Sequence, residues 1–146
     1  MPIIAGGVLE KDGKYLLVQE SKQKCYGKWN LPAGHIDAQE LLFDGAVREI
    51  KEETNCDVKL TGVCIIATQR CEEPSVYFVF ATKILTDDVK PQEGEILEAK
   101  WFSYEEIINM HDELRAPEWI IPSISAYRND DILPLSIITV TERKVQ

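Results

Sequence analysis

Three glutamates, Glu49, Glu52 and Glu53, lie at spacings that could bring their carboxylates together. If residues 40–54 form a helix, these positions are i, i+3 and i+4 and share one face. Like charges at the edge of a core repel each other and resist desolvation, so a chain tolerates them when a cation lies between them. An all-oxygen ligand set that keeps water suits Mg2+, with Mn2+ as a substitute. The spacing therefore predicts a metal site on this helix.

The same segment has a second interpretation. The run REIKEE at residues 48–53 is also typical of a solvated helix face held by i, i+4 pairs such as Arg48–Glu52. However, the segment also carries an apolar stripe with the period of a helix, made of Leu42, Phe43, Ala46, Val47 and Ile50. The three glutamates fall on the flank of that stripe rather than opposite it, which favours a functional cluster at the edge of a core.

The wider pattern extends from residue 34 to residue 56. Gly34 is followed after five residues by Glu40, and Glu40 is followed after seven residues by REIKEE. This arrangement resembles the Nudix box, G-x5-E-x7-R-E-U-x-E-E-x-G-U, and every fixed position before the final G-U pair matches. The clear departure is Asn55 in place of the last glycine. That residue ends the helix in a left-handed conformation, which Asn tolerates next best after Gly.

Members of the Nudix family hydrolyse a nucleoside diphosphate linked to another group, usually by attack of water on phosphorus. The resemblance implies that the Gly34 carbonyl and the carboxylates of Glu49, Glu52 and Glu53 bind Mg2+. The metal would neutralise the pyrophosphate and lower the pKa of bound water. Arg48 would act mainly as an organiser that fixes a glutamate in its ligand rotamer.

The general base of this family varies and often lies outside the box, on the loop before a W-F segment. Here that segment is Trp101-Phe102. Among the preceding glutamates, Glu95 is the first candidate, Glu98 the second and Glu93 a weaker third. A solvated surface charge is the other interpretation of each, since most glutamates are exposed. Within the box, Glu53 is an alternative base.

Substrate contacts are less clearly encoded. Lys28 and Trp29 lie just before the box, His35 follows the box glycine, and Arg115 matches a position in the tail of a bacterial Nudix subgroup. A lysine, an arginine or a histidine could bind phosphate, and Trp29 could stack on a ring. Further aromatic residues could stack or belong to the core, namely Tyr26, Tyr77, Phe78 and Trp119.

That subgroup contains phosphatases for nucleoside di- and triphosphates and for hydroxymethylpyrimidine pyrophosphate. The resemblance therefore favours a nucleotide or pyrimidine pyrophosphate as the substrate. Hydrolysis of oxidised nucleotides, ADP-ribose or dinucleoside polyphosphates is the alternative activity. A third possible function is that of a catalytically silent nucleotide sensor with the same fold, because a fold does not fix a function.

Composition limits the remaining classes. The chain has 146 residues, which is the size of one domain spanning 1–146. A net charge of −9 argues against nucleic acid as a partner but permits a small anionic substrate, because a bound cation reverses the local field. The four cysteines form no CxxC pair, and no apolar run is long enough to span a membrane. We expect a cytoplasmic protein, and a homodimer is compatible with this.

The predicted elements complete an α/β/α sandwich. Strands are expected at residues 3–9, 14–20, 57–70, 75–85, 96–102 and 135–140, and helices at 40–54, 104–110 and 117–129. The first two strands would form a hairpin through residues 10–13, and residues 72–74 would join the two long strands. Asp37 and Glu40 resemble a capping box for the first helix. Helices on both sides of a mixed, mainly antiparallel sheet give the sandwich.

Overall fold

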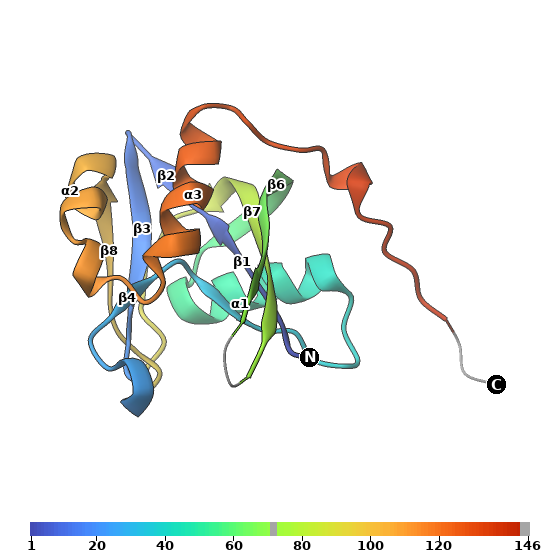
Figure 1. Cartoon of the computed structure of the whole chain (residues 1–146), viewed down its shortest axis with the longest axis horizontal. Coiled ribbons are helices and arrows are strands. Elements are labelled where there is room, and N and C mark those ends of the chain that lie inside the picture. The colour runs from blue at the N-terminus through green and yellow to red at the C-terminus, as the bar shows by residue number, and fades with distance from the viewer. Residues whose placement is uncertain (71–72, 144–146) are drawn as a thin grey trace.

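The computed structural model describes residues 1–70 and 73–143, which form two four-stranded sheets flanked by helices (Figure 1). The first sheet has the order β5-β1-β7-β6, and its strands are β1 (Ile3–Val8), β5 (Ala33–His35), β6 (Asp57–Gln69) and β7 (Ser75–Thr86). The second sheet is built around β3, and its strands are β2 (Glu10–Lys11), β3 (Lys14–Glu20), β4 (Trp29–Asn30) and β8 (Ile96–Ser103). Strands β1 and β7 are parallel, and the other named pairs are antiparallel.

Helices α1 (Leu42–Thr54) and α3 (Pro117–Arg128) cover opposite faces of the first sheet, whereas α2 (Tyr104–Asn109) packs against β8 of the second sheet (Figure 1). Successive residues of a strand point to opposite faces. Accordingly, Phe80 of β7 is buried in one core with Ile50 of α1, while its neighbour Val79 is buried in the other core with Ile120 of α3. The predicted sandwich of helices around a mixed, mainly antiparallel arrangement of strands is confirmed, although the strands divide into two sheets.

The predicted hairpin between the first two strands is wrong. Strand β1 lies in the first sheet, parallel to β7, whereas β3 lies in the second sheet. The turn at Asp12-Gly13, where both residues have positive φ, joins the short strand β2 to β3. Residues Ala5 to Leu9 are all fully or nearly buried, which is the pattern of a strand covered on both faces rather than of an outer hairpin.

Two other predicted boundaries are corrected. Helix α1 begins at Leu42 rather than at residue 40, and its N-cap Leu41 has no side-chain capping bond. Asp37 and Glu40 instead form a turn before the helix, in which the Asp37 N–H donates to a Glu40 carboxylate oxygen at 2.9 Å. The strand predicted at 135–140 is only a 3-10 turn at Leu135–Ile137. Part of the turn predicted at 72–74 lies outside the described residues.

The predicted left-handed end of α1 is confirmed, and local signals also mark the starts of α2 and α3. Asn55 adopts φ 66° directly after α1, and its N–H donates to the Lys51 carbonyl. Ser103 and Glu106 form a reciprocal capping box at the start of α2, and Pro117 occupies the first turn of α3. These signals depend only on residues close in sequence, so they can be read without knowledge of the tertiary fold.

Two further findings concern the described part of the chain. Cys25, Cys56 and Cys64 are buried free thiols. Within residues 1–70 and 73–143, none of the helices combines the length and apolar character needed to cross a bilayer.

Candidate active site

Helix α1 is fixed in rotation by its buried face. Ala46 and Ile50 are 0% exposed and pack against β1 and the neighbouring strands. Because the glutamates lie on the flank of this face, Glu49 and Glu53 are only partly exposed, while Glu52 is more open to solvent. The packing of the helix thus presents a row of carboxylates along the border between the core and water.

Strand β5 brings Gly34 against this row. A Cβ atom at Gly34 would lie 2.0 Å from a carboxylate oxygen of Glu49, so a side chain there would force the Glu49 carboxylate to move. Gly34 therefore lets the backbone of β5 approach the Glu49 carboxylate in its present position. This approach places the Gly34 carbonyl and the α1 carboxylates in one small region.

These groups line a cleft of about 290 Å3. Its charged and polar lining comes from several elements, namely Glu20, Lys22, His35, Asp37, Glu49, Glu52, Glu53, Gln92 and Glu95. The predicted helix glutamates, Gly34, His35 and the first candidate base, Glu95, are thus brought together. We conclude that the chain has a strongly acidic cleft at the flank of α1.

The Arg48 guanidinium links Glu40 with two glutamates that line the cleft, Glu49 and Glu52. It forms a two-pronged ion pair with Glu40, with Nε to oxygen at 2.8 Å, and its Nη1 contacts Glu49 at 2.9 Å and Glu52 at 3.1 Å. Its Nη2 also donates to the His35 carbonyl at 3.2 Å. These bonds raise the pKa of Arg48 and, with the backbone bond from residue 37, lower the pKa of Glu40 to about 2.

The pKa values of the partly buried Glu49 and Glu53 are raised, in contrast to the lowered pKa of Glu40. Burial raises the pKa of Glu53 to about 9, although the hydrogen bond from the Ala33 N–H, 3.0 Å long, favours the charged form. Burial also raises the pKa of Glu49, against the opposing effect of Arg48. Glu53 therefore has little local compensation for a negative charge, which is the electrostatic condition that a bound cation relieves.

The acidic cleft offers oxygen ligands that a divalent cation could bind. In residues 1–70 and 73–143, no group of three His, Cys, Asp or Glu side chains is already arranged as a metal-ligand set. The predicted ligands instead bond to the nearest donors, since Glu49 and Glu52 contact Arg48 and Glu53 accepts from Ala33. Their chemistry nevertheless fits Mg2+ or Mn2+, because the cluster contains only oxygen ligands and includes an uncompensated buried carboxylate.

A second pocket adjoins the acidic cleft and shares Glu20, Lys22, Gly34 and His35 with it. Its wall contains Tyr77 and Trp119, whose rings are stacked with centroids 4.8 Å apart, and the predicted substrate contact Arg115. Two residues of its lining, Asn30 and Trp119, each carry a buried polar atom, Oδ1 and Nε1 respectively, with no hydrogen-bond partner in the described part of the chain. Such atoms are rare in folded proteins and indicate a place where a ligand or water completes the bonding.

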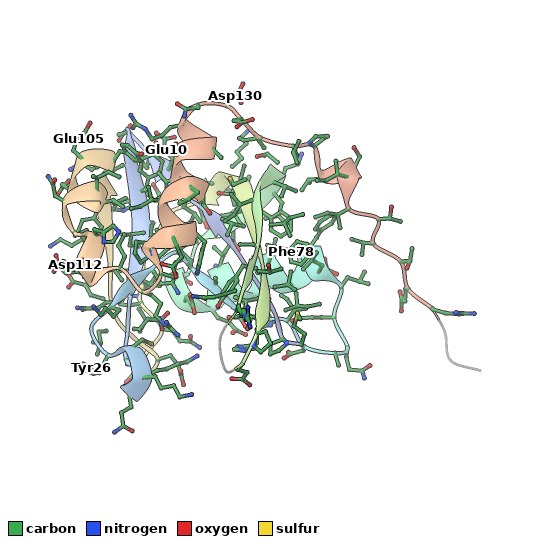
Figure 2. The ribbon with its side chains drawn as sticks, viewed as in Figure 1. Glu10, Tyr26, Phe78, Glu105, Asp112 and Asp130 are labelled. Carbon is green, nitrogen blue, oxygen red and sulfur yellow. The ribbon has the colours of Figure 1, made fainter. Side chains whose placement is uncertain are left out.

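Besides Arg48, which contacts the lining residues Glu49 and Glu52, three predicted site residues lie outside both pockets. Glu98 is exposed on β8, and Lys28 donates its Nζ hydrogen bond to the Asp112 carbonyl beside α2; Asp112 is labelled in Figure 2. Trp29 is 8% exposed and packs edge-on against Phe102, with ring centroids 5.0 Å apart. Their proposed roles in catalysis or binding gain no support from these positions.

Glu20, Lys22, Asn30 and Gln92 also line the pockets, although their places in the sequence did not identify them as site residues. Glu20 and Asn30 end the strands β3 and β4, and the Asn30 Nδ2 donates to a Glu20 carboxylate oxygen at 3.1 Å. Neither belongs to a charged cluster in sequence, so only the pairing of β3 with β4 reveals them. The one available signal was the place of Asn30 in the WNLP segment that leads into the box.

Several known proteins are similar to this chain in sequence or fold. Residues 2–122 match the family described as NUDIX domain. The chain is 30% identical over 136 residues to phosphatase NudJ of Escherichia coli, covering 90% of this chain and 86% of that protein. It is 34% identical over 112 residues to putative nudix hydrolase 1 of Caenorhabditis elegans. The matched region covers 75% of this chain but only 30% of that protein. A solved NUDIX hydrolase from Nitrosomonas europaea has a TM-score of 0.86 at 28% identity, covering 94% of this chain and 95% of the other.

The Arg48 network leads to a stability prediction. Because the folded protein holds the pKa of Glu40 at about 2, against 4.5 for a free side chain, the ionised carboxylate stabilises the fold above pH 4.5 and this contribution disappears as the pH falls towards 2. Glu40→Gln should lower the free energy of unfolding by about 1–3 kcal/mol at pH 7 and by clearly less at pH 3. Urea unfolding at both pH values measures this, with the exposed Glu113→Gln as the control. A loss that is equal at both pH values would contradict the ionic role of Glu40.

Proposed function

This chain belongs to the Nudix family of hydrolases, and on that premise we propose that it is a Mg2+-dependent pyrophosphohydrolase. Its substrate would be a nucleotide or pyrimidine pyrophosphate whose phosphoanhydride bond is cleaved. The observation that carries the proposal is the juxtaposition of two compartments around Gly34. One is the acidic cleft on α1, and the other is the pocket walled by Tyr77 and Trp119.

The metal would be held by the acidic cleft. Its ligands would be the carboxylates of Glu49, Glu52 and Glu53 and the carbonyl oxygen of Gly34. When bound, Mg2+ supplies charge neutralisation for the pyrophosphate and lowers the pKa of coordinated water. The partly buried carboxylates of Glu49 and Glu53 favour this assignment, because their burial is costly until a cation compensates them.

The protein side chains would complete the reaction. Arg48 holds Glu49 and Glu52 by charge-assisted hydrogen bonds and so limits their rotamers. Glu95, which lines the same cleft, would accept the proton of the attacking water on its carboxylate as that water adds to phosphorus. Phosphoryl transfer depends mainly on positioning and electrostatic stabilisation, and the arrangement offers both.

The second pocket would bind the ring of the substrate. Its volume of about 110 Å3 is well below the roughly 300–1,000 Å3 of whole small-molecule sites, so it suits one end of a ligand. The stacked Tyr77 and Trp119 rings offer an aromatic wall, while Asn30 Oδ1 would accept and Trp119 Nε1 would donate a hydrogen bond. A planar ring that carries both a donor and an acceptor satisfies these groups.

Basic side chains lie where the phosphates would pass between the compartments. Lys22 and His35 line both pockets, and Arg115 lines the ring pocket. Lys22 and Arg115 can balance the negative charge of a pyrophosphate that the acidic cleft alone would repel, and His35 can donate a hydrogen bond to it. The order of the compartments thus favours a ligand with a ring at one end and a pyrophosphate at the other.

Phosphate release from a panel of compounds tests the proposal. The panel contains nucleoside di- and triphosphates, hydroxymethylpyrimidine pyrophosphate, ADP-ribose and a dinucleoside tetraphosphate, each with Mg2+ and with chelator. We expect chelator-sensitive turnover with nucleoside or pyrimidine pyrophosphates ranked first. Glu53→Gln, which keeps the shape of the side chain, should reduce turnover about a hundredfold or more. Glu105→Gln on α2, at the side of the molecule away from α1 in Figure 2, is the control.

Two results would contradict the proposal. Turnover that persists in full with chelator would remove the metal from the reaction. Full activity of Glu53→Gln would remove the α1 cluster from the active site. A ranking led by ADP-ribose or by the dinucleoside compound would keep the hydrolase but replace the proposed substrate class.

Arg115 provides a separate test of the ring pocket. Arg115→Ala should raise KM about tenfold, because a charge-assisted hydrogen bond to the substrate contributes about 1.5–3 kcal/mol, while kcat changes less. Steady-state kinetics with the best substrate of the panel measures both constants. Arg128→Ala is the matched control, since Arg128 lies over the Tyr104 ring at 4.3 Å and does not line either pocket. An unchanged KM in Arg115→Ala would exclude Arg115 from the site.

A further inference from the structure

The loop between β7 and β8 packs on the C-terminal end of α1. Helix ends leave carbonyl groups without partners inside the helix, and such groups need donors from elsewhere. Here the Lys90 N–H donates to the Thr54 carbonyl at 2.9 Å, and the Gln92 N–H donates to the Glu53 carbonyl at 3.3 Å. The loop at residues 87–95 therefore uses the end of the proposed metal-binding helix as its support.

Asn55 adds a third contact that the box glycine could not make. Its backbone takes the left-handed conformation, with φ 66°, that ends α1. At the same time its Nδ2 donates a hydrogen bond of 2.9 Å to the Asp88 carbonyl. A glycine at this position would satisfy the backbone but would leave the loop without this bond. The departure from the box thus has a structural consequence outside the helix.

The same loop delivers side chains to the acidic cleft. Gln92 and Glu95 both line the cleft beside Glu53. The far end of the loop is held by Ser21, whose Oγ donates to the Glu95 carbonyl at 2.7 Å. The segment that carries Glu95 is therefore held at Asp88 by Asn55, along its length by the end of α1, and at Glu95 by Ser21.

We propose that Asn55 is a positioning residue for the reaction. By tying the loop to α1, it holds the Glu95 carboxylate in a fixed relation to the glutamates that the same helix carries. The role rests on the proposed function, because it assumes that Glu95 acts on the attacking water. A general base must lie within hydrogen-bond reach of the proton it removes, so a looser loop lowers the fraction of productive complexes.

Two substitutions separate this role from simple stabilisation. Asn55→Gly removes the hydrogen bond to Asp88, which destabilises the fold, but glycine adopts the left-handed backbone more easily, which stabilises it. Because these two effects on stability oppose each other, Tm should change little. Asn55→Asp keeps the shape of the side chain but replaces its donor with an acceptor that faces the Asp88 carbonyl. If the bond to Asp88 matters, both variants should lose turnover despite their different effects on the backbone.

Amide hydrogen exchange of the metal-free protein tests the tether without any turnover. In both variants the amides of Lys90 and Gln92 should exchange at least about fivefold faster than in the wild type. The amide of residue 55, which donates to the Lys51 carbonyl, is the internal control and should stay protected. Unchanged exchange at residues 90 and 92 in both variants would overturn the tether.

A double-mutant cycle tests positioning through Glu95. Asn55→Gly should lower kcat about fivefold in the wild-type background, with KM nearly constant, but less than about twofold in the Glu95→Gln background. An equal loss in both backgrounds, or no loss in either, would overturn the positioning role. An inactive wild type would instead contradict the proposed function, so the two failures are distinguishable.

Discussion

The arrangement of the site depends on the burial of negative charge at the edge of a core. Ala46 and Ile50 anchor α1 so firmly that its flanking glutamates cannot all turn into water. The Arg48 guanidinium offsets part of this charge beside the cleft, where it contacts Glu40, Glu49 and Glu52. Glu53 lies deeper, and the only described hydrogen bond to its carboxylate comes from the Ala33 N–H. Burial therefore disfavours the ionised form of Glu53, which a divalent cation would stabilise.

The two compartments follow from the way the sheets are joined. Strand β5 lies beside β1 and places Gly34 next to α1, while Trp119 of α3 and Tyr77 of β7 approach from the opposite core. Gly34 therefore stands at the boundary between an oxygen-rich cleft and an aromatic pocket. This boundary explains how one short backbone segment can serve both the phosphate end and the ring end of the proposed substrate.

Local patterns predicted the course of α1 and the grouping of its glutamates better than they predicted the sheets. The spacing of Glu49, Glu52 and Glu53 and the left-handed end at Asn55 depend on residues of one helix, so the sequence alone reveals them. The partners of β1 could not be read in this way, because its parallel neighbour β7 is about seventy residues away and the nearby hairpin signal was misleading. Lys22, Asn30 and Gln92 were missed for the same reason, since tertiary contacts alone bring them to the cleft.

Diffraction from crystals soaked in Mn2+, recorded at the manganese absorption edge, tests the central claim most directly. Mn2+ is a suitable probe because it accepts the same oxygen ligands as Mg2+. The account predicts an anomalous peak bounded by the Gly34 carbonyl and the carboxylates of Glu49, Glu52 and Glu53. A peak elsewhere, or an unliganded cluster in which Arg48 still holds both Glu49 and Glu52, would contradict it.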